Sequence, residues 1–301
     1  MERVGKLLAR THGELLVSKY RLRQAEGIAL VRQRRDEGRQ NLGFNSRPFV
    51  LCGLPLRRPP RDQLLFERRN GNFVLQVTGH PEFGLPFGQD RLVPIFLATL
   101  AVRQQSQTIR FKSASVMLET FGMAKGGKEY RRLVAAFVRI FGATIFFGTD
   151  SVSATARIVH RSRFNFLREA TIWYQRDGTT GGENVVTLTD EFFAEVMAHP
   201  IPTDLEAVKI LAASPGVLDL FVWLSYRCFT ARASEEIPIF GNYGLAHQLG
   251  CIEYSRPRRF VAMLEQWLVA IRAVWPDCPA KVTADATRLQ VSHASPIYMS
   301  P

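Results

Sequence analysis

The sequence predicts an α+β protein in which one arrangement of elements occurs twice. The first copy is an apolar run at 108–111, a short segment at 113–122 that ends at a glycine, and a basic amphipathic stretch at 128–141. The second copy follows in the same order, about 128 to 130 positions later, at 237–240, 242–250 and 256–275. A strand, a short helix and a long helix, followed by further strands, are typical of a winged helix-turn-helix. Because such repetition is unlikely to arise from composition, we expect two tandem winged-helix domains.

The net charge predicts a polyanionic partner. The 301-residue chain has a formal charge of +12 and a pI of about 10.0. Residues 1–69 contain 16 Lys and Arg against 7 Asp and Glu, whereas residues 70–301 contain 23 against 20. This distribution favours nucleic acid as the partner and places a basic arm at the N-terminus. The alternative for the arm is a tail that only keeps the protein soluble.

The length allows two domains with cores of their own. We expect a basic extension at 1–47, either partly helical or a disordered arm. A first winged-helix domain is expected at 48–199 and a second at 200–298.

The elements of the first domain follow from local patterns. Residues 49–60 are rich in proline, which favours a linker or an edge strand over a helix. Residues 72–78 alternate apolar and polar side chains, as a half-buried strand does. Asp90 is a suitable N-cap for an apolar helix that runs to about Gln104. Four further strands, separated by turns at 148–150 and 177–182, are expected at 143–147, 153–160, 164–174 and 185–189.

The second domain shows comparable signals. Thr203 with Glu206 forms a capping box ahead of an apolar helix, and Pro215 begins another that runs to about Phe229. Ser255 is the expected N-cap of the long helix, with Pro257 in its first turn. Two short strands, at 281–284 and 288–291, would close the domain as its wing.

The long helix of the first copy is the clearest candidate for binding DNA. At 100° per residue, one sector of about 100° holds only cations and a small residue, namely Lys128, Arg131, Arg132, Ala135 and Arg139. The apolar residues of the helix fall on the opposite side, and Glu129 points about 90° away from the stripe. A helix of this kind fits the major groove, where arginine binds phosphates or guanine. The alternative is a solvated charged face.

Further basic residues complete the expected DNA interface. Lys125 precedes the first long helix, and Arg161 and Arg163 lie near a hairpin end, where a wing would reach the DNA backbone. The long helix of the second copy begins with Arg256, Arg258 and Arg259, although Glu265 makes its outer face less uniformly basic. Scattered surface arginines are the alternative for the hairpin.

The sequence contains no catalytic or metal-binding motif. Residues 122–128 match G-x-x-x-x-G-K, but Glu129 stands where a nucleotide-binding loop has Ser or Thr, and the glycines are better explained as a turn between two helices. The six histidines have no metal-ligand spacing, and the four cysteines form no C-x-x-C pair, which favours reduced, buried thiols. We therefore expect neither an enzyme nor a bound metal or cofactor.

No membrane or secretion signal is expected either. The longest apolar run, roughly Leu92 to Val102, is shorter than the ~20 residues that a membrane span needs. The N-terminus has no apolar signal-peptide core. We expect a cytoplasmic protein without a membrane partner.

Two blocks resemble plasmid-encoded RepA replication initiators of Gram-negative bacteria. They are HPEFGLPFGQDRLVP at 80–94 and YRRLVAAFVRIFGATIFFG at 130–148, and the resemblance covers roughly residues 48–298. It implies a theta-type initiator with winged-helix domains that binds repeated origin sites, helps to open the duplex and brings in the host initiator and replicative helicase. It also implies a possible homodimer that represses its own promoter, beside a monomer that binds the origin.

Two other classes of function stay open on the sequence alone. A transcription regulator without a replication role needs the same grip on DNA. An enzyme acting on nucleic acid would reveal itself by metal-dependent nicking or ATP hydrolysis. An RNA-binding role is less favoured, because no aromatic-rich stacking strand is present.

Overall fold

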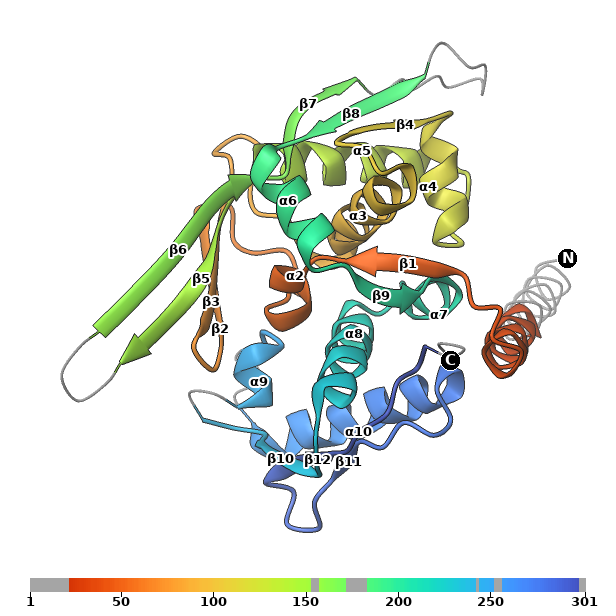
Figure 1. Ribbon diagram of the computed structural model, residues 1–301, viewed down its shortest axis with the longest axis vertical. Coiled ribbons are helices and arrows are strands. Elements are labelled where there is room, and N and C mark those ends of the chain that lie inside the picture. The colour runs from red at the N-terminus through yellow and green to blue at the C-terminus, as the bar shows by residue number, and fades with distance from the viewer. Residues whose placement is uncertain (1–21, 153–156, 172–182, 242–243, 252–255, 298–301) are drawn as a thin grey trace, which may run out of the picture.

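The computed structural model describes residues 22–152, 157–171, 183–241, 244–251 and 256–297, and it shows a mixed α/β fold of helices and antiparallel sheets (Figure 1). Within this part of the chain, no helix is long and apolar enough to cross a membrane. One continuous cluster of buried apolar side chains runs from Val31 to Val291. Packing therefore continues across position 200, where the sequence suggests a domain boundary.

Part of the expected N-terminal arm is an ordered helix. Residues 22–36 form a helix, shown in red in Figure 1, that packs against the C-terminal half of the chain. Arg32 donates to the backbone oxygen of Ala273 at 2.7 Å, and Arg35 binds Asp277 through two hydrogen bonds of 2.5 and 2.8 Å. These contacts place two arginines at a helix C-terminus, where unpaired carbonyls favour cations. Residues 1–21 of the expected arm lie outside the described residues.

The first copy of the repeat has the element order expected from the sequence. It contains α3 (Leu92–Gln104), β4 (Thr108–Phe111), α4 (Ala114–Thr120), α5 (Gly127–Gly142), β7 (Leu167–Thr171) and β8 (Asn184–Leu188). Its three strands form an antiparallel sheet in the order β4-β8-β7. The last strand of the copy thus lies between the first and the second.

The second copy repeats this topology. It contains α8 (Pro215–Thr230), β10 (Glu235–Pro238), α9 (Leu245–Gln248), α10 (Pro257–Val274), β11 (Lys281–Val282) and β12 (Arg288–Val291), with strand order β10-β12-β11. Gly122 follows α4 with φ of 62°, and Gly250 follows α9 with φ of 73°. Both glycines adopt the left-handed conformation that ends helices, which is why each short helix stops there. The repetition of strand, short helix and long helix is confirmed.

A long β-hairpin interrupts the first copy and corrects one expected turn. β5 (Thr144–Val152) and β6 (Arg157–Asn165) join β2 (Leu65–Asn70) and β3 (Phe73–Thr78) in the order β2-β3-β5-β6, and the hairpin extends away from the rest of the molecule (Figure 1). The expected turn at 148–150 is wrong, because these residues lie within β5. There β6 pairs with all three residues and β3 pairs with the first two, so strand hydrogen bonds override the local preference for a turn. The other expected turn, at 177–182, lies outside the described residues.

The remaining elements correct three local expectations. α2 (Arg47–Leu51) is a short helix where an extended linker was expected, and Pro48 fits because it lies at the start. Asp90 lies inside the 3-10 turn η1 (Gly88–Arg91) before α3 and is not an N-cap. Residue Thr203 lies in β9 (Ile201–Asp204), which pairs with β1 (Leu42–Asn45), and Asp204 caps α7 (Leu205–Leu211) instead.

Close packing of α8 on α10 depends on one glycine. A Cβ atom at Gly216 would overlap the ring of Trp267, which packs edge-on against buried Phe260. We expect Gly216→Ala to destabilise the protein by about 1 to 2 kcal/mol in chemical denaturation, because overpacking costs about 1 to 3 kcal/mol and alanine returns at most about 1 kcal/mol of helix propensity. Gly127→Ala in α5, where a Cβ atom meets nothing, is the matched control and should be neutral or stabilising. An equal effect of both changes would contradict the packing argument.

Candidate nucleic-acid interface

α5 presents its cations on one side and buries the other. Its buried residues are Leu133, Ala136, Phe137 and Ile140, which recur at helical spacing. Lys128, Arg131 and Arg132 are all exposed. The buried apolar face therefore packs α5 against the core, while three cations of the expected stripe face solvent.

The cations near the start of α5 differ in whether they form an ion pair with a carboxylate. Arg132 lies 2.8 Å from Glu129, an i,i+3 neighbour, and Lys125 forms an ion pair with Glu119 that raises the pKa of its ammonium. Lys128 and Arg131 have no ion-pair partner among the described residues. Glu129 thus binds a cation of the stripe, although its position in the sequence places it about 90° away from the stripe. Surface pairs of this kind are weak and exchange readily with phosphate.

Arg139 lies at the C-terminal end of the stripe, but its side chain binds within the protein. Its Nε and Nη2 atoms bind the two carboxylate oxygens of Asp90 at 2.6 and 2.9 Å, and its guanidinium lies 4.7 Å from the centre of the Phe87 ring. The side chains of Arg139 and Asp90 are 14% and 4% exposed. Asp90 also accepts a hydrogen bond from the backbone of Phe87. Arg139 therefore fixes α5 on the turn before α3 rather than projecting toward a ligand.

We expect Arg139→Gln to lower the free energy of unfolding by roughly 3 kcal/mol, because it leaves the buried Asp90 carboxylate without its cation. The salt dependence of DNA binding should stay unchanged, since this charge is already neutralised within the protein. Urea denaturation and a salt titration of binding measure the two effects separately. A stable variant with a flatter salt dependence would show that Arg139 contacts DNA.

Both expected arginines near the hairpin lie outside the sheet of the first copy. Arg161 and Arg163 lie on β6, opposite Gly148 and Phe146 of β5, and Arg163 is exposed. The side chain of Arg161 lies outside what the structure describes. The sheet of the first copy contains β7 and β8 instead. β5 and β6 therefore form an additional hairpin outside that sheet.

α10 begins with three exposed arginines. Arg256 is the N-cap residue, and Arg258 and Arg259 lie in the first turn, none of them with an ion-pair partner among the residues described. The expected cap, Ser255, lies outside the described residues. At the other end of the helix, Arg272 donates to the backbone oxygen of Ala280 at 2.5 Å. The free charge of α10 is therefore concentrated at its N-terminal end.

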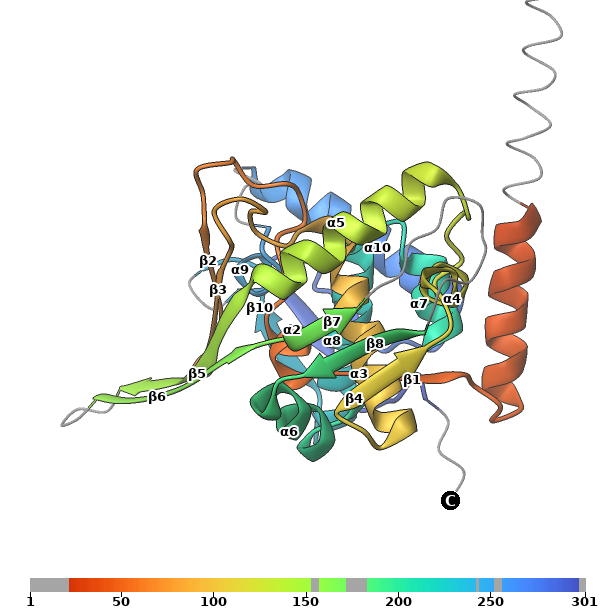
Figure 2. The ribbon, with the colours of Figure 1, turned by 90° about the horizontal axis from the view of Figure 1, so that it is seen from above.

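The two cationic helices lie on the same side of the molecule. In Figure 2, α5 and the N-terminal part of α10 both run along one side, and β4 and α6 (Asp190–Ala198) occupy the opposite side. Figure 1 shows the same two helices toward opposite ends of the long axis. A single extended polyanion along this side can therefore contact both.

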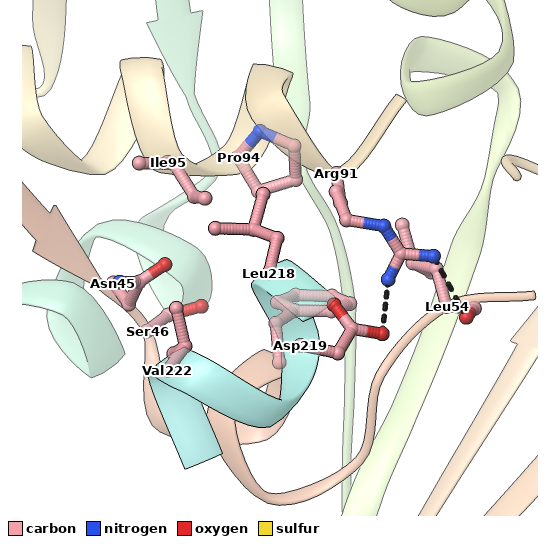
Figure 3. Close-up of a pocket in the computed structure, with 10 residues that line it drawn as sticks. Asn45, Ser46, Leu54, Arg91, Pro94, Ile95, Leu218, Asp219 and Val222 are labelled. Atoms are coloured by element: carbon pink, nitrogen blue, oxygen red, sulfur yellow. Dashed lines mark hydrogen bonds and ion pairs between the residues drawn. The ribbon is translucent and has the colours of Figure 1, made fainter. Parts of the chain in front are cut away.

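A buried ion pair joins the two copies, and sequence patterns did not reveal it. Arg91 at the start of α3 binds Asp219 of α8 and the backbone oxygen of Leu54 (Figure 3). It also donates to the backbone oxygens of Gly88 and Pro55. Burial raises the pKa of Asp219, and the charge of Arg91 opposes that shift. The two residues are 128 positions apart, the same separation as between Gly122 and Gly250.

The surroundings of this ion pair do not form a ligand site. The cavity beside it, lined among others by Asn45, Ser46 and Leu218, has a volume of about 20 Å³ (Figure 3). Such a space holds nothing larger than a water molecule. The ion pair is therefore a joint between the copies.

The described residues offer no metal cluster and no activated thiol. No group of three His, Cys, Asp or Glu side chains comes together there. All four cysteines are buried and none of them forms a disulfide, as expected, and burial raises the pKa of Cys52 and Cys228 to about 12. The glycines at 122–127 connect α4 with α5, which confirms the turn between two helices.

Comparison with known families identifies the chain. Residues 55–205 match the family described as Replication initiator protein A. The chain belongs to this family. The match spans α3, α4, the long hairpin and α5, the helix that carries the first cationic stripe. Membership supports a role in the initiation of replication and implies DNA binding.

Solved structures show a similar fold. The crystal structure of RctB domains 2-3 aligns with a TM-score of 0.50 and 13% identity, covering 79% of this chain and 92% of that chain. A crystal structure of selenomethionine derivatives of RctB domains 2 and 3 aligns with a TM-score of 0.49 and 16% identity, covering 71% and 79%. At such identity the likeness shows the fold alone. Among curated proteins, none matches this sequence.

Proposed function

We propose that this protein initiates replication by gripping double-stranded DNA with two winged-helix units. The observation that supports this proposal most strongly is the repeated topology. In each copy, the last helix of the helix-turn-helix is long and has exposed cations. In this proposal α5 and α10 enter the major groove, and β7–β8 and β11–β12 are the wings. Phosphate contacts set the register and base contacts select the site.

The DNA contacts of the proposal are drawn from the cations of α5, of α10 and of the hairpin. Lys128 and Arg131 are its strongest members, because their charges are unpaired in the described structure. Arg132 and Lys125 would exchange their carboxylate partners for phosphate. The remaining members, on the hairpin and at the start of α10, are Arg161, Arg163, Arg256, Arg258 and Arg259.

The two units, at 48–199 and 200–298, would act as one rigid clamp. The Arg91–Asp219 joint and the shared apolar core support this arrangement, since they resist independent movement of the units. A rigid clamp can bend DNA or help to melt it, because the binding energy of both units is available for deformation. No bond chemistry is required of the protein.

Further steps of initiation belong to the same proposal. Binding to tandem origin repeats, opening of the duplex, and recruitment of the host initiator and replicative helicase follow from the family resemblance. So does repression of its own promoter by a homodimer.

Transformation tests the role in replication. A replicon that carries the origin but lacks its initiator gene is introduced into cells that supply this protein in trans. Colonies are expected with the wild-type protein and none with the Lys128→Ala/Arg131→Ala variant. Promoter repression without any transformants would favour a transcription regulator instead.

A further inference from the structure

A cleft lies beside the far end of α5. It has a volume of about 300 Å³ and is walled by two loops, at 56–62 and 80–87. Its polar side chains are Arg58, Arg61, Glu82 and Arg139. The first loop contains a third arginine, Arg57, and one carboxylate, Asp62. The loop therefore carries a net positive charge.

The ring of Phe87 lies close to an arginine of this loop and to an arginine of the cationic stripe. The guanidinium of Arg139 lies 4.7 Å from the centre of the Phe87 ring, and that of Arg58 lies 6.0 Å from the same centre. Arg139 belongs to the stripe that begins at Lys128, eleven residues or roughly 16 Å earlier along the helix. Arg58 is thus placed where the stripe would continue beyond α5.

Arg58 and Arg61 supply positive charge beside the end of α5, where Asp90 neutralises the charge of Arg139. Asp90 neutralises Arg139, so α5 alone offers no free cation in its last turns. Arg58 and Arg61 are exposed, and Arg61 has no partner among the residues described. Two prolines, Pro59 and Pro60, stand between them and limit the conformations of the loop. Two arginines are therefore held at the end of the stripe on a restrained backbone.

Figure 2 agrees with this placement. The orange loops that flank β2 and β3 rise on the same side of the molecule as α5 and the start of α10. A duplex lying along that side would pass the loop after leaving α5.

We propose that the 56–62 loop is a third DNA contact, in which Arg58 and Arg61 bind backbone phosphates that flank the segment occupied by α5. The proposal rests on the proposed function, because it assumes a duplex on this side. The ligand is the phosphate backbone of DNA, without base selection. Glu82, on the opposite wall of the cleft, opposes the contact and limits its strength.

Salt titration of binding to a DNA fragment that contains the origin tests the proposal with full-length protein. Each phosphate contact contributes a log-log slope of about −0.9. Arg58→Ala/Arg61→Ala should therefore flatten the slope by about 1.8, and Arg61→Ala alone by about 0.9. The single variant keeps the test independent of the packing of Arg58 on Phe87. Glu82→Gln should bind more tightly than the wild type.

Arg110→Ala is the matched control. Arg110 is an exposed arginine on β4, which Figure 2 places on the side of the molecule away from α10, and its ion pair with Glu183 is solvent-exposed. The control should leave the slope unchanged. If the wild type binds, Lys128→Ala/Arg131→Ala flattens the slope and the loop variants do not, the third contact is overturned while the proposed function stands. If the wild type shows no salt-dependent binding, both fall.

Discussion

Lys128→Ala/Arg131→Ala is expected to weaken origin binding roughly 60-fold at 0.1 M salt and to flatten the log-log salt dependence by about 1.8. Both side chains are exposed and unpaired in the described structure, so each can neutralise one phosphate and release its counterion. Arg132→Ala should have a smaller effect, because Glu129 already offsets part of its charge. Fluorescence anisotropy over a range of salt concentrations measures both quantities.

The fold should not change in this variant, since the buried apolar face of α5 is untouched and exposed substitutions usually alter stability by at most about 0.5 kcal/mol. Arg110→Ala removes an equal charge per substitution from the opposite side and controls for net charge. An unchanged slope in the double variant would mean that the stripe is a solvated face, and the assignment of α5 as a recognition helix would fail.

Asp219→Ala is expected to destabilise the protein by about 3 to 5 kcal/mol, the largest effect of any single change considered. The side chains of Arg91 and Asp219 are 6% and 10% exposed, and removing the carboxylate leaves a guanidinium buried without a counter-charge. Urea denaturation measures the loss as a lower midpoint with an unchanged slope.

Replacing both partners tests the origin of that loss. Arg91→Met/Asp219→Leu removes both charges and should recover part of the stability, as buried pairs replaced by apolar residues often do. Recovery should stay incomplete, because the carbonyls of Gly88, Leu54 and Pro55 lose their donors. A loss below about 1 kcal/mol for Asp219→Ala would contradict the view of this pair as the joint between the copies.

The repeated elements could be predicted because their signals are local. The spacing of Leu133, Phe137 and Ile140 defines the buried face of α5, and the left-handed glycines at 122 and 250 end the short helices. Apolar periodicity and turn chemistry act over a few residues, so they are legible in a single sequence.

The missed features depend on contacts between distant segments. Residues 148–150 have the composition of a turn, but pairing with β3 and β6 makes them part of a strand. Arg139 is predicted to be free, but it binds Asp90, which lies 49 positions earlier in the sequence. The ion pair of Glu129 has a different cause. Glu129 points about 90° away from the stripe, but an i,i+3 neighbour such as Arg132 lies within reach of its side chain.

Footprinting of the full-length protein on the DNA that flanks its gene tests the central claim most directly. We expect protection of tandem repeats, with two protected segments in each repeat, one for α5 and one for α10. Lys128→Ala/Arg131→Ala should remove the first segment, and Arg258→Ala/Arg259→Ala the second. Protection of one inverted repeat at a promoter, or no protection at all, would contradict an initiator that grips origin DNA with two helices.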